Sequence, residues 1–315
     1  MPLVPCKCTN CGANLQVDNT KDAAICEFCG SAFIVEKAIN NYNVTNHITA
    51  GVVNYYGGNQ GDFVIRGGVL EKYTGAATDV VIPDTVTSIG AEAFTGLMIT
   101  SVQIPNSVIR IEDGKNSSFQ ISGAFFNCRA LRKVILPNSV KIIGGNAFRG
   151  CTSLTEITIP NSVTEIRQQA FSSTGLTSVT ILGVIRMGDF VFYGCSGLNN
   201  VTIGKDVVEI GNYSFGHCTG LMDLTIPDNV IRIGNYAFQG CKLKNLRIEG
   251  TPELGEACFL SNPSNINVIA RSEWISKHRN DFPCKIFQTL RLDGETEKKP
   301  ENGLTTWLRS LWRGR

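Results

Sequence analysis

Four cysteines near the N-terminus have the spacing of a metal site. They form two CxxCG motifs, Cys8 to Gly12 and Cys26 to Gly30, separated by a short polar and aliphatic stretch. Two such pairs are typical of a four-thiolate tetrahedral zinc site, and the glycine after each pair permits a tight backbone turn beneath the metal. The sequence therefore predicts one Zn²⁺ ion bound by Cys8, Cys11, Cys26 and Cys29.

The predicted metal is structural, because four protein ligands leave no open coordination position for a substrate. The cysteine motifs resemble a zinc ribbon, which we assign to residues 1–36. The alternative is that these are reduced cysteines in a small disordered leader. Cys6 is either a spare thiol or a substitute for Cys8, although Cys6-Lys7-Cys8 is too short to be a CxxC pair.

The rest of the sequence gives little sign of catalysis. It contains no P-loop, no dinucleotide-binding fingerprint and no evident Ser-His-Asp set. His217 beside Cys218 is the one pair that suggests a nucleophile or a metal ligand, but no second histidine and no orienting carboxylate accompany it. We therefore expect a protein that is not an enzyme.

Composition and charge exclude some classes of protein. The 315 residues are 43% hydrophobic and 18% charged, with a formal net charge of +2, which gives no global field to attract nucleic acid or an anionic membrane. The N-terminus lacks the charged start and apolar core of a secretory signal, so we expect a cytoplasmic protein. The 12 cysteines are then metal ligands and buried apolar residues, because the cytosol keeps thiols reduced.

The element that must position everything else is a repeat of about 22 to 23 residues, a period that is typical of a solenoid. We count eight units, the second of which carries an insertion from Glu112 to Gln120. The units are residues 80–101, 102–133, 134–156, 157–178, 179–200, 201–223, 224–245 and 246–267.

Four apolar positions recur in each unit, and the last of them is aromatic. We expect each unit to add a short strand to a continuous parallel sheet and to stack its phenylalanine on that of the next unit. The fold class is thus a mainly β repeat solenoid preceded by a small zinc ribbon. The recurring aromatic residues are Phe94, Phe125, Phe148, Phe171, Phe192, Phe215, Phe238 and Phe259.

The repeat has the form IPNSVxxIxxxAFxGCxxLxx and resembles the repeat of the BspA-like leucine-rich-repeat family over residues 80–267. Members of that family are often bacterial cell-surface proteins that bind host or matrix proteins and neighbouring cells. The resemblance implies that the array binds a macromolecule. This chain departs from that pattern in having no export signal and in carrying the two cysteine motifs.

One candidate binding surface is a row of threonines at the outward strand position. Each is flanked by a polar residue just before its strand, so the row makes a neutral, hydrogen-bonding face for a protein partner. Threonine also simply suits strands, which is the structural alternative. The partner-binding candidates are Thr158, Thr180, Thr202 and Thr225, with Glu156, Asn200 and Asp223, and Ser178 has the same flanking position.

Two further columns have structural interpretations. Glu165, Arg186, Glu209 and Arg232 alternate in sign, and we expect neighbours to pair with each other. Cysteines at one repeat position should form a column of small buried side chains, although disulfide geometry alone does not exclude bridging. These cysteines are Cys128, Cys151, Cys195, Cys218 and Cys241.

The segments around the array have less definite patterns. Residues 37–62 favour one or two exposed strands or a flexible linker, and residues 63–79 read as a hairpin that caps the array. Residues 268–289 suit a C-terminal cap with a helix whose N-cap is Ser272 and whose apolar side carries Trp274, Ile275, His278 and Phe282.

Residues 290–315 should be a flexible linker that ends in an amphipathic basic tail. The tail suits docking on a membrane surface or on a partner, or it is simply disordered. Its apolar side carries Trp307, Leu308, Leu311 and Trp312, and its basic side carries Arg309 and Arg313.

The sequence thus favours a non-enzymatic scaffold that binds a protein partner through the exposed strand face. Two other functions stay open. The first is a nucleic-acid-associated protein that acts through the zinc ribbon, which the few basic residues near the motifs, Lys7 and Lys21, make the weaker interpretation. The second is a cell-surface adhesin that is exported without a recognisable signal.

Overall fold

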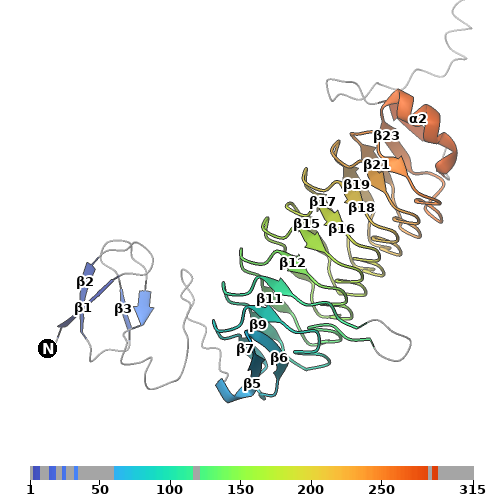
Figure 1. Cartoon of the computed structure of the whole chain (residues 1–315). Helices are drawn as coiled ribbons and strands as arrows, with labels where there is room; N and C mark the ends of the chain where they lie inside the picture. The colour runs from blue at the N-terminus through green and yellow to red at the C-terminus, as the bar shows by residue number, and fades with distance from the viewer. Residues whose placement is uncertain are drawn as a thin grey trace, which may run out of the picture.

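The computed structural model in Figure 1 describes residues 3–7, 14–18, 23–25, 32–34, 60–115, 121–282 and 286–289 of the chain. Four short strands lie near the N-terminus. Strand β1 (Leu3–Lys7) pairs antiparallel with β2 (Asn14–Asp18), and β3 (Ala23–Ile25) pairs antiparallel with β4 (Ala32–Ile34). The strands predicted within residues 37–59 lie outside the described residues.

Residues 60–115, 121–282 and 286–289 form a solenoid whose turns are stacked between the β5–β6 hairpin and helix α2 (Figure 1). One side of each turn adds a short strand to a ten-stranded sheet. Apart from the antiparallel β5–β6 pair, neighbouring strands of this sheet run parallel. Its strands are β5 (Phe63–Arg66), β6 (Val69–Tyr73), β8 (Ser88–Ile89), β10 (Arg110–Ile111), β12 (Ile142–Ile143), β14 (Glu165–Ile166), β16 (Arg186–Met187), β18 (Glu209–Ile210), β20 (Arg232–Ile233) and β22 (Glu253–Leu254).

The opposite side of the turns carries strands of three or four residues that form three separate parallel sheets, and not the single continuous sheet that the repeats predict. The ladder is interrupted between β11 and β13 and again between β17 and β19. The first sheet holds β7 (Asp79–Val81), β9 (Ser101–Gln103) and β11 (Lys133–Ile135), and the second holds β13 (Glu156–Thr158), β15 (Ser178–Ile181) and β17 (Asn200–Ile203). The third holds β19 (Asp223–Ile226), β21 (Asn245–Ile248), β23 (Asn267–Ala270) and β24 (Ile286–Thr289).

Proline turns join the two sides of the solenoid. The carbonyl of Pro137 accepts a hydrogen bond from the Val140 amide at 3.3 Å, and Pro160 and Val163 make the same bond at 3.0 Å. Proline suits this corner because it fixes φ and donates no hydrogen bond to a ladder. The valine that follows is completely buried in both turns, so the corner also delivers an apolar side chain to the core.

The core is organised by the stacked phenylalanines, which we call the aromatic spine. The eight predicted rings, Phe94 to Phe259, are all fully buried. Neighbouring ring centroids lie 4.9 to 5.5 Å apart, with interplanar angles from 2° to 19°. Each buried ring contributes about 1.5–3 kcal/mol by leaving water. The prediction of a solenoid with a stacked aromatic core is confirmed.

The solenoid has about nine turns, one more than the eight units counted from the sequence. The extra turn begins in the hairpin before the first repeat, because β6 joins β8 in the parallel ladder. Tyr73 then lies below Phe94, with ring centroids 5.5 Å apart, and Phe63 lies against Tyr73 at 5.1 Å. The hairpin thus supplies the first rung of the spine and hides its lower end.

The other end of the spine is closed by helix α2 (Ser272–His278) and the 3₁₀ turn η2 (Arg279–Asp281). Phe282 stacks on Phe259 at 4.6 Å, and the indole nitrogen of Trp274 donates to the Pro252 carbonyl at 2.8 Å. The prediction that Ser272 caps the helix is wrong. Arg271 holds the N-cap position without a side-chain hydrogen bond, and Ser272 is the first helical residue.

A second 3₁₀ turn, η1 (Gln60–Asp62), precedes β5. Within the part of the chain that the structure describes, no helix has the length and hydropathy needed to cross a membrane.

Candidate functional site

The four predicted zinc ligands, Cys8, Cys11, Cys26 and Cys29, lie outside the described residues. The described strands on either side give their setting in the chain. Residues 8–13 connect β1 to β2, and residues 26–31 connect β3 to β4, so each CxxCG motif falls between two strands that pair antiparallel. Cys6 lies in β1, where it is paired in register with Leu15. The tail residues from Trp307 to Arg313 are likewise outside the described part.

The predicted threonine row is exposed on the side of the solenoid that carries the three shorter sheets, which we call the strand face. Thr158, Thr180 and Thr202 are direct neighbours in the register of β13, β15 and β17. Thr225 lies beyond the second interruption, on β19, and is paired in register with Arg247. The structure therefore brings three of the four threonines together in one sheet and places the fourth in the next.

The hydroxyls of these four threonines make no hydrogen bond to any described residue. Threonines at the corners of the turns behave differently. The hydroxyl of Thr177 donates to the Thr155 carbonyl at 3.2 Å, and that of Thr164 donates to the Lys141 carbonyl at 3.4 Å. The hydroxyls of the corner threonines thus form hydrogen bonds between neighbouring turns, whereas those of the four strand threonines remain available to a bound molecule.

The flanking polar residues divide in the same way. Glu156 and Asn200 are exposed and have no side-chain partner among the described residues, and both are in register with half-buried Ser178. Asp223 instead accepts a hydrogen bond from the Asn245 side chain at 2.6 Å. The Asp223 side chain therefore bonds within the third sheet. The candidate site is limited to the residues of the second sheet.

A hollow of about 570 Å³ opens where the ladder is interrupted between β11 and β13. The charged side chains of Lys133 and Glu156 border it, and Ile135 is 42% exposed beside them. The polar residues Thr158, Ser178 and Thr180 also line the hollow. The hollow thus has an apolar side chain with polar side chains around it, as a protein-protein interface has an apolar centre and a polar rim.

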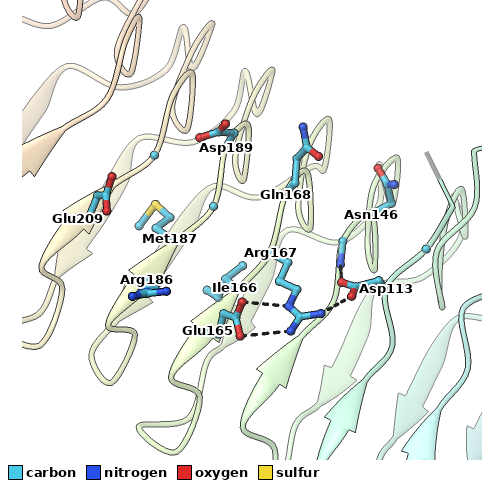
Figure 2. A pocket seen from close by; sticks show the side chains of 14 residues that line it. Asp113, Asn146, Glu165, Ile166, Arg167, Gln168, Arg186, Met187, Asp189 and Glu209 are labelled. Carbon is cyan, nitrogen blue, oxygen red and sulfur yellow. Dashed lines mark hydrogen bonds and ion pairs between the residues drawn. The ribbon is translucent and has the colours of Figure 1, made fainter. Parts of the chain in front are cut away.

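A second depression, the polar groove, lies beside the ten-stranded sheet and has a volume of about 530 Å³ (Figure 2). Asp113, Glu165, Asp189 and Glu209 give it four carboxylates against the two guanidinium groups of Arg167 and Arg186. Its lining crosses several turns and includes Asp113 from the insertion in the second unit.

Arg167 is held at the centre of one charged cluster in this groove. Its Nε lies 3.0 Å from Glu165, and its Nη1 is paired with Asp113, which is 54 residues away in the chain (Figure 2). The same repeat position is glycine in the turns on either side, Gly144 and Gly188. A Cβ added at Gly188 would lie 2.8 Å from the backbone nitrogen of Gln168, so a side chain at this position is unusual.

The expected pairing along the alternating charge column occurs only in part. Arg232 is paired with Glu209, as expected, but Glu165 is paired with Arg167. Arg186 is exposed and has no ion-pair partner among the described residues. The reason is that Glu165 and Glu209, its neighbours in register, are each taken by another arginine.

The five cysteines of the predicted column are buried and unbridged. Each thiol donates to a main-chain carbonyl of the preceding turn, as Cys151 does to Phe125 at 3.1 Å. Burial raises the pKa of Cys128 and Cys241 to about 12, so these thiols stay protonated. The prediction of small buried side chains is confirmed, and a sixth free cysteine, Cys258, is buried at another repeat position.

His217 and Cys218 do not form a catalytic pair. The imidazole of His217 is exposed and lies edge-on to the Tyr193 ring at 5.4 Å, whereas the Cys218 thiol points into the core and donates to the Phe192 carbonyl. Within residues 60–115 and 121–282, no group of three His, Cys, Asp or Glu side chains could hold a metal ion.

One set of surface residues was not singled out in the sequence. Phe190, Tyr213 and Tyr236 occupy the repeat position two residues before the spine phenylalanine, and their rings stack outside the core. We call this set the surface aromatic stack. The signal was present in the alignment of the repeats, where polar Asn146 and Gln169 hold the same position in earlier turns.

Two solved leucine-rich-repeat structures are similar to this chain, and the first of them supports the fold. The T. pallidum leucine rich repeat protein TpLRR is 22% identical, with a TM-score of 0.50, over 73% of this chain and 98% of that chain. A leucine-rich repeat protein from Bacteroides ovatus ATCC 8483 is 24% identical, with a TM-score of 0.43, over 70% of this chain and 71% of that chain. No curated protein matches the sequence.

The BspA type leucine rich repeat region matches this sequence in overlapping copies at residues 72–185, 121–210 and 185–282. These matches cover more than half of the chain and coincide with the stacked turns and their aromatic spine. The chain therefore belongs to the family of proteins with BspA type leucine rich repeats.

Proposed function

We propose that the chain is a non-enzymatic scaffold that binds a protein partner through the exposed strand face of its second sheet. Leucine-rich-repeat proteins generally bind proteins. The observation that carries the proposal is the threonine row beside the hollow. The hydroxyls of Thr158 and Thr180 have no partner in the part of the chain that the structure describes, and both residues line a depression that also exposes Ile135. A partner could satisfy those hydroxyls and bury the isoleucine in one contact.

The experiment is a quantitative capture from native lysate with three full-length proteins. The first is the wild type, the second carries Thr158→Lys and Thr180→Lys, and the third is a control with Ser196→Lys and Ser264→Lys. The control serines are exposed and lie outside the strand face, so the control has the same added charge. We expect a protein that is retained by the wild type and the control and lost with the threonine variant. The same set of captured proteins from all three would contradict the proposal.

We also propose a structural Zn²⁺ bound by Cys8, Cys11, Cys26 and Cys29. What supports it is that each CxxCG motif falls between two antiparallel strands, which is the setting of a zinc knuckle. The strands of three to five residues are too short to supply a core, so the metal would provide most of the stability of this segment. The ion would hold residues 1–36 folded and would take no part in a reaction.

A cytosolic location is part of the same proposal. It is supported by the six buried cysteines of the array, which are all unbridged, as expected for a protein that folds where thiols are kept reduced. Cell fractionation tests it, and recovery of the protein at the cell surface would instead make the strand face a site for an extracellular partner. Contact of the tail with a membrane is tested by comparing liposome co-sedimentation of the full chain with that of a chain truncated after Gly303.

A further inference from the structure

The surface aromatic stack runs parallel to the spine over three consecutive turns and then stops. Phe190 and Tyr213 are 4.7 Å apart with an interplanar angle of 4°, and Tyr213 and Tyr236 are 4.9 Å apart at 12°. All three rings are half-buried. In the next turn the same repeat position is Ala257, so the layer that would hold a fourth ring beside Tyr236 carries only the methyl group of an alanine.

The fold itself does not require aromatic residues at this position. The backbone there is left-handed, with φ of 58° at Phe190, 54° at Tyr213 and 55° at Tyr236. Among residues with a side chain, asparagine is one of those that tolerate this conformation best, and Asn146 holds the position with φ of 58° in an earlier turn. Gln169 and Ala257 hold the same position with φ of 60° and 48°, so the turn itself does not select aromatic side chains, and three stacked rings on the surface point to a contact with another molecule.

Negative charge lies beside the open end of the stack. The Glu256 carboxylate is exposed and accepts a hydrogen bond from the Tyr236 hydroxyl at 3.1 Å. No cation among the described residues pairs with Glu256. The loops that carry the stack and its open end, residues 188–194, 211–217, 234–240 and 255–261, contain no lysine and no arginine.

The Asp189 carboxylate lies at the other end of the stack. It accepts hydrogen bonds from the Asn212 amide at 2.8 Å and from the Asn212 side chain at 3.2 Å, without a cation partner among the described residues. The aromatic surface therefore has a carboxylate at both ends and no positive charge of its own. The polar groove, which Asp189 also lines, has twice as many carboxylates as guanidinium groups.

We propose that this surface binds an arginine side chain of a partner protein. The planar guanidinium stacks on the free face of Tyr236, in the layer where Ala257 replaces a ring, and donates hydrogen bonds to Glu256. Arginine fits this site better than other side chains for three reasons. Its guanidinium group stacks on the face of a tyrosine ring, its positive charge matches the carboxylates, and its fork-shaped donors fit a carboxylate. The site is on a different surface from the threonine row and does not depend on it.

The test uses the full-length protein with ¹³C-labelled tyrosine rings and the probe N-acetyl-arginine methylamide. N-acetyl-citrulline methylamide, which has nearly the same shape without the charge, is the matched control. We expect the arginine probe to shift the ring signals of Tyr236 in a saturable manner and to leave those of Tyr73 unchanged, because Tyr73 is buried in the spine. Equal shifts with citrulline, or no saturable shift of Tyr236, would overturn the proposal.

Two variants locate the probe. Glu256→Gln removes the carboxylate and should weaken binding by about tenfold or more. Ala257→Tyr should extend the stack by one ring, fill the layer and abolish binding, and the left-handed φ of 48° at Ala257 is close to that at Tyr236. Glu273→Gln, an exposed carboxylate on the cap helix, is the charge control and should bind normally. Undiminished binding by Ala257→Tyr would contradict the stacked position.

The basic tail of this chain is the other possible occupant. Truncation after Gly303 distinguishes the two, because removal of the tail should leave the affinity for the probe unchanged if the site serves a partner. A gain in affinity on truncation would assign the site to the tail of this chain and overturn the partner assignment. None of these outcomes bears on capture through Thr158 and Thr180, so the two proposals fail separately.

Discussion

The thiol of Cys218 donates a hydrogen bond to the main-chain carbonyl of Phe192, in the preceding turn, across 3.2 Å. The same bond recurs along the array and ties each cysteine to the aromatic spine of its neighbour. The other donors are Cys128 to Phe94 at 2.9 Å, Cys151 to Phe125 at 3.1 Å, Cys195 to Phe171 at 3.1 Å and Cys241 to Phe215 at 3.1 Å.

The residues that replace cysteine in two turns are also donors. Thr174 donates to the Phe171 carbonyl at 2.9 Å, and the Asn262 side chain donates to the Phe238 carbonyl at 2.7 Å. This repeat position is thus a buried side-chain donor in the turns from Cys128 to Asn262, whereas the first unit has the partly buried Leu97 there.

Replacing Cys218 by threonine and by valine separates the hydrogen bond from packing, because these two side chains have the same shape. We expect Cys218→Thr to be more stable than Cys218→Val by about 0.5–1.5 kcal/mol, the usual net contribution of a buried hydrogen bond. Urea unfolding followed by circular dichroism measures the difference. If the cysteine served only as an apolar filler, valine would be the more stable replacement.

The buried thiols should make the array sensitive to alkaline pH. The pKa of Cys128 and Cys241 is about 12 in the folded protein, whereas an unfolded thiol titrates near about 8.5. Between these values the folded state holds more protons, so the free energy of unfolding falls as the pH rises, by up to about 1.4 kcal/mol per pH unit for each thiol. Below the unfolded pKa the contribution is complete.

The variant Cys128→Thr with Cys241→Thr isolates this contribution from the titration of tyrosines and lysines. Its free energy of unfolding, measured at several values from about pH 7 to pH 10.5, should fall less steeply than that of the wild type. Parallel curves for the two proteins would show that the thiols do not contribute.

Loss of one ring from the spine should divide the solenoid. Phe148 lies between Phe125 at 5.0 Å and Phe171 at 5.2 Å and is completely buried. Phe148→Ala should cost about 3–5 kcal/mol. Because each turn contacts only its neighbours, a weak mid-array interface should uncouple the two halves. Hydrogen exchange during denaturant unfolding should then show two transitions where the wild type shows one, and the milder Phe148→Leu should retain one.

Metal analysis tests the proposed zinc site directly. We expect one zinc per chain, lost in Cys11→Ser and retained in the control Cys6→Ser, since Cys6 is the cysteine of residues 1–36 that lies outside the two CxxC motifs. A chelator should raise amide exchange in residues 1–36 and leave the array unchanged, because the array has its own core. Zinc retained in Cys11→Ser, or lost in Cys6→Ser, would contradict the assigned ligands.

The repeat positions that face inward could be predicted from the sequence because one physical rule governs all of them. A turn without an apolar residue at the position of Val163, Ile166 or Phe171 would leave a cavity against its neighbours. The same residue types therefore recur in every turn, and the repeat can be recognised in the sequence. The ninth turn was missed because Tyr73 takes the place of a spine phenylalanine within a hairpin that has a different spacing.

The surface features were harder to predict because no common rule sets them. The contact of Arg167 with Asp113 depends on where the insertion of the second unit lies in space, 54 residues away in the chain. The interruptions between β11 and β13 and between β17 and β19 fall at the two units of 23 residues, 134–156 and 201–223, but one extra residue in a repeat does not by itself predict a broken ladder. The threonine row could be found in the sequence because it repeats. Its use as a binding site depends on hydroxyls that make no hydrogen bond to the described residues, which is evident only from the structure.

Each turn of the solenoid contacts only the turn before it and the turn after it, which has a mechanical consequence. Pulling the ends of the array apart loads the turns along the axis of stacking, so each coil is released only when its contacts with the next coil fail. A released coil of about 22 residues adds up to roughly 75 Å of extended chain. The array would thus lengthen under tension in steps of similar size, with one longer step for residues 102–133, which carry the insertion.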